Sequence, residues 1–172
     1  MRHHPRALVI GIGTVFAAAG PLWVGGGYGV DGVVFLLALE AIPFLALAAV
    51  STDMPWWLGA SAATVFGAFT DSGMRSIHDS TSSTAVIAIP FIPLILLAAV
   101  PVLLAACDVV VLGRHRARGG AIERPTRGEV VLALVLAAFG FLAFFVFGLA
   151  AGLATAFAVW AHRVRPSAWR RT

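Results

Sequence analysis

The last third of the chain contains an apolar stretch that a soluble fold does not accommodate. From Glu129 to Ala161 the sequence runs for 33 residues with no charged side chain after Glu129. Only 12% of the 172 residues are charged, whereas soluble domains carry about 25%. So little polar surface cannot cover a globule in water. The sequence therefore predicts an all-α, polytopic helical membrane protein that forms a single bundle.

Five apolar segments are candidates for transmembrane helices, because about 20 apolar residues are needed to cross a bilayer. They comprise residues 7–24, 33–50, 55–70, 85–112 and 129–161. Segment 55–70 is short and opens with Trp56 and Trp57, which are residues typical of the membrane–water interface. A helix lying in the interface is therefore its alternative interpretation, and would leave four spans.

Segment 129–161 decides the number of spans. A straight helix of 33 residues is about 50 Å long, whereas the hydrocarbon core is ~30 Å thick. The small residues Gly148, Gly152 and Ala156 form an unbroken stripe through its midpoint. We therefore predict one long helix with the C-terminal tail outside. The alternative is a tight hairpin near 147–152, which gives six spans and a tail inside.

Arginine supplies all twelve basic residues, and eleven of them flank the apolar segments. This is the distribution of cytoplasmic membrane flanks rather than of a nucleic-acid-binding face. We expect the N-terminus and loop 113–128 in the cytoplasm and loop 71–83 outside. The lipid bilayer is the expected partner, and no nucleic acid is. Anionic headgroups would be bound by Arg114, Arg116, Arg118, Arg124 and Arg127.

The composition also indicates a compartment. Arginine without lysine, beside abundant Ala, Val and Gly, is typical of a high-GC bacterial genome, so we expect the bacterial cytoplasmic (inner) membrane. Segment 7–24 resembles a signal peptide through its basic start and Ala17-x-Ala19, but we expect a retained signal anchor. The glycine-rich run 25–32 predicts an external turn. Cys107 is the single cysteine, so neither a disulfide nor a cysteine-based metal site is predicted.

Glu40 lies near the middle of segment 33–50, where an ionisable side chain is costly and faces the protein interior. Its own helix offers no hydrogen-bonding partner. We expect one from Thr14, Ser61 or Thr64, which lie at comparable depth. An apolar environment favours the neutral acid. Two interpretations remain open: a proton or cation site, or a neutral side chain that fixes helix packing through one hydrogen bond.

A second polar group follows segment 55–70, which Gly73 is expected to terminate. Its chemically versatile members are Asp71, Arg75, His78 and Asp79. They form either a solvated loop in which Arg75 pairs with Asp79, or a polar mouth above Glu40. A metal site is a third interpretation, but the spacing matches no ligand motif and Arg75 would repel a cation. We predict no metal, no cofactor and no catalytic residue.

These features favour a non-enzymatic membrane protein, either an accessory subunit or a self-associating component. A stripe of small residues at Gly59, Ala63 and Gly67 allows the backbone of another helix to approach closely, and the stripe at 148–156 does the same. The alternative is a small transporter or channel that uses Glu40 for protons or a small solute. An intramembrane enzyme has the least support, because no acid–base pair shares a recognisable face.

Overall fold

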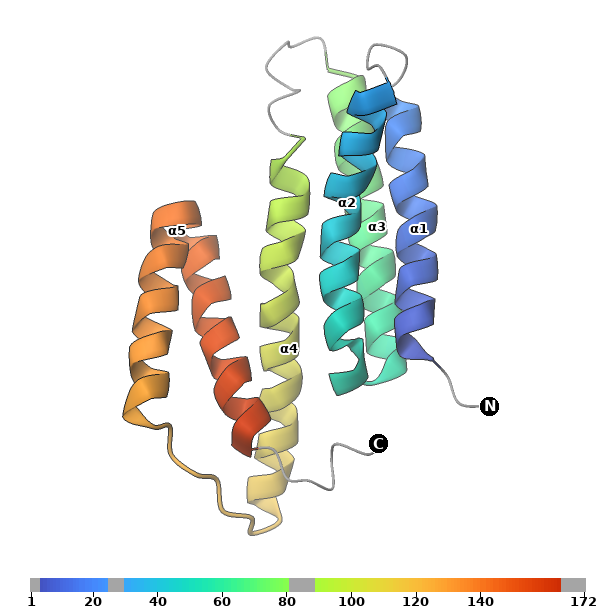
Figure 1. The fold of residues 1–172 in the computed structure, drawn as a ribbon. Coiled ribbons are helices and arrows are strands. Elements are labelled where there is room, and N and C mark those ends of the chain that lie inside the picture. The colour runs from blue at the N-terminus through green and yellow to red at the C-terminus, as the bar shows by residue number, and fades with distance from the viewer. Residues whose placement is uncertain (1–3, 25–29, 81–88, 165–172) are drawn as a thin grey trace. The chain divides into compact units, whose positions relative to one another are not determined.

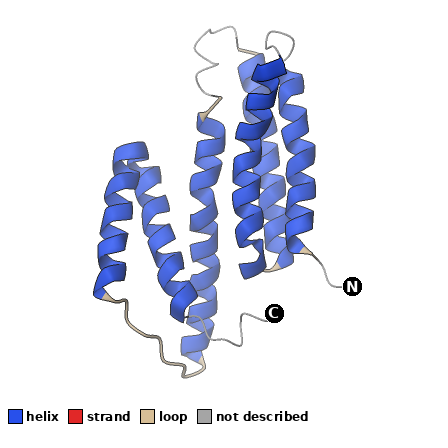
Figure 2. Ribbon diagram, viewed as in Figure 1, coloured by secondary structure: helices blue, strands red, loops and turns tan. Residues whose placement is uncertain are grey.

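The computed structural model describes residues 4–24, 30–80 and 89–164, and every regular element within them is a helix (Figure 2). The elements are α1 Pro5–Val24, α2 Val30–Val50, the short 3-10 helix η2 Ser51–Asp53, α3 Trp56–His78, α4 Phe91–Ala117 and α5 Arg127–Val164 (Figure 1). The predicted all-helical class is confirmed. Within the described residues, three helices are long and apolar enough to cross a membrane: Val30–Asp53, Phe91–Ala117 and Phe145–Val164.

The chain divides into two compact units. Unit 1 comprises Met1–Leu97 and unit 2 comprises Ala98–Thr172, so the boundary falls within α4. Two predicted features lie partly outside the described residues: the glycine-rich turn at 25–29, and the start of segment 85–112 up to residue 88.

Small residues bring the helices of unit 1 together. The stripe of α3 faces α1: Gly59 lies against Val9, Ala63 is fully buried, and Gly67 lies so close to the ring of Phe16 that a side chain would not fit there. In α1, Gly13 gives room in the same way to Phe44 of α2. The prediction that this stripe admits another helix is thus confirmed, and the helix belongs to the same chain.

Helix α3 extends eight residues beyond its predicted end, so the prediction that Gly73 terminates it is wrong. The helix ends at His78, where the backbone N–H of Asp79 donates to the carbonyl of Arg75 at 2.9 Å. A glycine within a helix costs about 1 kcal/mol relative to alanine. Here the missing side chain leaves room for Ile92, so tertiary packing offsets the local preference.

Helix α4 differs from the prediction at both ends. It begins at Phe91, directly after Pro90, and only Pro101 lies within its interior beyond the first turn. It ends at Ala117, five residues later than predicted. There Gly119 adopts a left-handed backbone conformation with φ of 82°. The N–H of Gly120 donates to the carbonyl of His115 at 3.0 Å, which completes a Schellman motif.

Helix α5 folds back on itself, so the prediction of one long helix is wrong (Figure 1). Gly140 lies against the carbonyl of Gly148, and Gly152 lies against the carbonyl of Leu136. The reversal is at Phe145, whose φ of 50° lies in the left-handed region. The predicted alternative, a hairpin, is therefore what the chain forms, with its turn slightly earlier than 147–152.

The glycines of this hairpin account for the wrong prediction. The stripe at 148–156 indicates close helix packing but does not identify the partner, which is the first half of the same apolar segment. Antiparallel backbones approach this closely only where no Cβ intervenes. The sequence around the turn contains no proline, Asn or Asp to mark the reversal.

We expect Gly152→Ala to destabilise the hairpin by about 1–3 kcal/mol, because its Cβ would collide with backbone rather than with a flexible side chain. The matched control is Gly113→Ala in α4, where a Cβ meets nothing within 4 Å. Alanine there should be neutral or stabilising by up to about 1 kcal/mol. Thermal unfolding in detergent measures both. Equal stability of the two variants would contradict the hairpin.

Candidate functional site

Glu40 is the most unusual polar residue of unit 1. It lies in the middle of α2 and its exposed fraction is 1%. Its buried neighbours on α2 are the apolar residues Leu36, Pro43, Phe44 and Leu47. Neither carboxyl oxygen has a hydrogen-bond partner among the described residues. A buried polar group without a partner costs about 1–3 kcal/mol, so this arrangement calls for an explanation.

The three partners predicted from the sequence do not reach Glu40. The hydroxyl of Thr14 donates to the carbonyl of Ile10 at 2.8 Å, and that of Thr64 donates to Ala60 at 3.0 Å. Ser61 is exposed. Hydroxyls within helices commonly bond the carbonyl one turn back, and here this local bond replaces the predicted contact between helices.

A different hydroxyl, that of Thr70, lies at the level of Glu40. Phe44 of α2 and Phe66 of α3 pack edge to face, with their ring centroids 6.4 Å apart. Glu40 lies one turn from Phe44 and Thr70 one turn from Phe66, in the same direction along these antiparallel helices. Thr70 is 2% exposed. Glu40 and Thr70 are therefore two buried polar side chains at one level of the unit.

Sequence analysis missed Thr70 because it placed the end of the helix there. The signal was nevertheless present, since Phe66, Thr70 and Met74 recur at every fourth position, and all three are buried. Continuing the helical pattern past Gly73 would have placed Thr70 on the core face.

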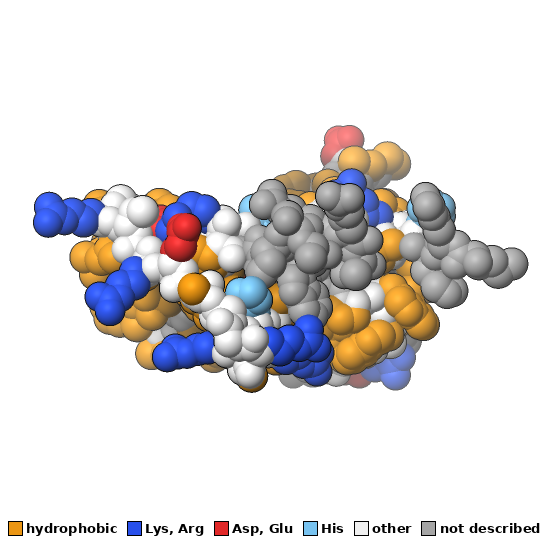
Figure 3. Space-filling view, turned by 90° about the horizontal axis from the view of Figure 1, so that it is seen from below, with side chains coloured by type: hydrophobic (Ala, Val, Ile, Leu, Met, Phe, Trp, Pro, Cys, Tyr) orange, Lys and Arg blue, Asp and Glu red, His pale blue; other side chains and the backbone are white. Residues whose placement is uncertain are grey.

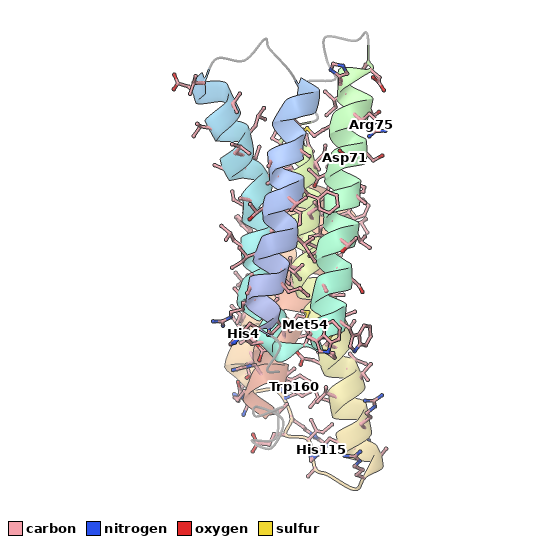
Figure 4. The ribbon with its side chains drawn as sticks, turned by 90° about the vertical axis from the view of Figure 1, so that its right-hand side faces the viewer. His4, Met54, Asp71, Arg75, His115 and Trp160 are labelled. Carbon is pink, nitrogen blue, oxygen red and sulfur yellow. The ribbon has the colours of Figure 1, made fainter. Side chains whose placement is uncertain are left out.

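The other predicted residues lie on the last turns of α3 and not in a loop. Arg75 and Asp71 form an ion pair of 3.6 Å between residues four apart (Figure 4). His78 ends the helix and Asp79 caps it. From Thr70 to His78 the helix rises about 12 Å. The residues at 71–79 thus lie between the level of Glu40 and the C-terminal end of α3. Glu40 is buried, and the 71–79 group is closer to that end of the helix.

Unit 2 contains an ion cluster that sequence analysis did not predict. The guanidinium of Arg163 donates to both carboxylate oxygens of Glu129, at 2.7 and 3.1 Å, and to Glu123 at 2.9 Å. It thereby joins the two ends of the α5 hairpin. The residues are 34 and 40 positions apart, so only the fold reveals the cluster.

Glu129 also begins α5. Its carboxylate accepts the N–H of Thr126 at 2.7 Å, and its own N–H donates to the Thr126 hydroxyl, which is a capping box. Glu129 therefore joins the start of the α5 hairpin to its end through Arg163.

Asp108 of unit 2 is buried, with an exposed fraction of 1%. The arginines of loop 113–128 were expected at the membrane surface. These arginines are exposed, and Figure 3 shows arginine side chains on the face of the molecule seen from below. The exposed set is Arg114, Arg116, Arg118, Arg124 and Arg127.

The described residues contain no group of three His, Cys, Asp or Glu side chains placed to hold a metal ion. Comparison with known proteins adds no assignment: no family model, curated protein or solved structure matches the chain. The residues themselves therefore carry any argument about function.

We expect Glu40→Met to leave the free energy of unfolding unchanged or to raise it by about 1–3 kcal/mol, because methionine fills a similar volume without unpaired oxygens. Ser51→Ala is the contrasting variant. Its buried hydroxyl donates to the carbonyl of Ala48 at 2.8 Å, so its removal should cost about 1 kcal/mol. Denaturant unfolding in micelles measures both. Strong destabilisation by Glu40→Met would indicate that Glu40 holds the unit together.

Proposed function

We propose that this chain is a multi-pass membrane protein that moves protons or a small solute through Glu40, as a small transporter or channel. The observation that carries the proposal is the burial of a carboxyl group with neither oxygen paired. Ionisable residues within membrane helices are costly and commonly mark ion or proton pathways. A residue that served packing alone would be expected to have a hydrogen-bond partner.

The polar residues of α3 supply a plausible route to Glu40. Thr70 lies at its level, the Asp71–Arg75 pair follows within about one turn, and His78 lies at the helix end. The side chains of Asp71 and Arg75 are 29% and 54% exposed. Polarity therefore increases from Glu40 toward the end of α3. We propose this end as the external mouth of the pathway.

The membrane arrangement that we propose has six spans. The 38 residues of α5, less the 20 from Phe145 to Val164, leave 18 for the first arm. The arms would be about 27 and 30 Å long, close to the ~30 Å hydrocarbon core. With α1 to α4 this even number places the N-terminus, loop 113–128 and the arginine-rich tail on one side. That side is the cytoplasm of a bacterial cell by the positive-inside rule.

A non-enzymatic subunit of a larger membrane complex is the second candidate. Its specific support is the tip of the α5 hairpin, where Leu142, Phe145 and Phe147 are 82%, 72% and 74% exposed. Such a surface suits lipid or another membrane protein. Self-association has lost its original support, because both stripes of small residues pack within the chain. Stoichiometric copurification of a membrane protein in mild detergent would favour this candidate.

We expect Glu40→Gln to abolish most proton flux, because the amide has the shape of the neutral acid but cannot release a proton. The full chain is reconstituted in liposomes with an internal pH-sensitive dye, and flux is driven by a potassium diffusion potential. Asp31→Asn is the matched control, since it removes an exposed carboxylate from the same helix. Flux through Glu40→Gln at the wild-type rate would exclude the proposed pathway. Absence of flux in the wild type would favour the subunit.

The six-span arrangement predicts that both ends of unit 2 face the cytoplasm. In a Cys107→Ser background, a cysteine at Arg118 and one appended after Thr172 should react with an impermeant maleimide only after spheroplasts are permeabilised. A cysteine at Ser80, at the opposite end of the spans, should react in intact spheroplasts. Labelling of the appended cysteine in intact spheroplasts, without labelling at 118, would instead require an odd number of spans.

A further inference from the structure

We infer that Thr70 is the positioning residue for Glu40 and that the site they form takes a proton rather than a metal cation. The inference rests on the proposed function, which it deepens by naming a second residue and the transported species. It arises from the juxtaposition of two buried polar side chains on neighbouring helices.

The helix register places the two residues at the same level of unit 1. The Phe44–Phe66 contact fixes α2 against α3, and one further turn on each helix leads to Glu40 and Thr70. A second route through α1 gives a similar level: Gly13 lies against Phe44, and Phe16, one turn later, lies against Gly67. The two routes agree within about one helical turn, which is about 5.4 Å.

The chemistry of Glu40 and Thr70 is suited to a site that binds and releases a proton. A threonine hydroxyl both donates and accepts hydrogen bonds, so it serves the carboxylate as a donor and the neutral acid as an acceptor. A small rotation of either side chain exchanges these roles. A carboxyl group that has no fixed partner in the structure is free to use this hydroxyl in either protonation state.

The surroundings disfavour a metal cation. Magnesium and calcium require six or more oxygen ligands. The pair offers three oxygen atoms, and the buried neighbours Leu36, Phe44 and Phe66 offer none. A bare cation would therefore be left mostly desolvated, which costs far more than the pair can return. A proton needs one oxygen and leaves a neutral group.

Among the described residues of unit 1, no other titratable side chain is buried at this level. Helix α1 has none between Arg6 and Val24, and residues 91–97 of α4, which belong to unit 1, have none. On α2 the nearest is Asp31, at the start of the helix. On α3 the nearest are Asp71, Arg75 and His78, which lie toward the partly exposed end. A titration observed at this depth can therefore be assigned to Glu40.

Dicyclohexylcarbodiimide provides the test, because this apolar reagent modifies protonated carboxyl groups in apolar surroundings. The full chain in liposomes is treated across a pH series, and mass spectrometry of peptides measures the adduct on Glu40. We expect labelling of Glu40 that declines as pH rises. In Thr70→Val the carboxylate loses a donor, so labelling should persist to a pH about one unit higher.

Two matched variants complete the experiment. Thr64→Val removes an exposed hydroxyl that bonds its own helix, and it should label like the wild type. Thr70→Ser keeps the hydroxyl and should restore the wild-type profile. If Thr70→Val matches Thr64→Val, the positioning role is overturned. If sodium or magnesium ions protect Glu40 from labelling at constant pH, the proton assignment is overturned.

The labelling result is separable from the flux result. Loss of flux in Glu40→Gln together with an unshifted Thr70→Val profile would overturn this inference and leave the proposed function standing. A shifted profile in a chain that carries no flux would support the pair as a protonatable site and overturn its role in transport. Failure to label Glu40 at any pH would overturn the inference directly.

Discussion

In the membrane that we propose for this chain, lipid supplies no hydrogen bonds, and the rest of the structure depends on this constraint. Within a bilayer, every backbone polar group must find its partner inside the protein, so the apolar segments become helices. The helix-capping motifs occur where the sequence becomes polar. The capping box of Thr126 and Glu129 and the Schellman motif at Gly119 and Gly120 both flank the basic loop. Among the described residues, two side chains do not obey the constraint: the carboxyl group of Glu40 in unit 1 and the indole N–H of Trp160 in unit 2.

The same constraint explains why glycine organises both units. Apolar side chains gain little by leaving lipid for one another, so helices associate through close packing instead. In unit 1 this packing joins α3 to α1 through Gly59 and Gly67, and in unit 2 it joins the arms of α5 through Gly140 and Gly152. Because these contacts are internal, the small residues that suggested association with another protein are already occupied. The proposed function is therefore based on Glu40 and not on the stripes of small residues.

Much of the fold follows from the sequence, and the failures have physical causes. The apolar pattern predicts α1 and α2 closely, since segments 7–24 and 33–50 correspond to Pro5–Val24 and Val30–Val50. The end of α3 was misplaced because Gly73 is a local helix breaker that Ile92 compensates from a distance. The α5 reversal was predicted only as the alternative to one long helix, because it occurs at Phe145 within an uninterrupted apolar run. Contacts between distant residues decide both features, and a local pattern does not contain them.

The candidate site shows the same division between local and distant information. The position of Glu40 in the middle of an apolar segment was sufficient to single it out, but not to find its neighbour. The position of a threonine within a segment does not tell which face of the helix its hydroxyl occupies. The chain also shows what a purely structural polar group looks like. Ser51 is buried with its hydroxyl bonded to Ala48, and the carboxylate of Glu129 has bonds from both Thr126 and Arg163. Glu40 is buried as deeply as Ser51 and has no such bond. A side chain whose purpose was to fix packing would be held as these are. A carboxyl group without a hydrogen bond, at the level of a buried hydroxyl, is the arrangement that we expect if the proton, and with it the direction of the hydrogen bond, has to change.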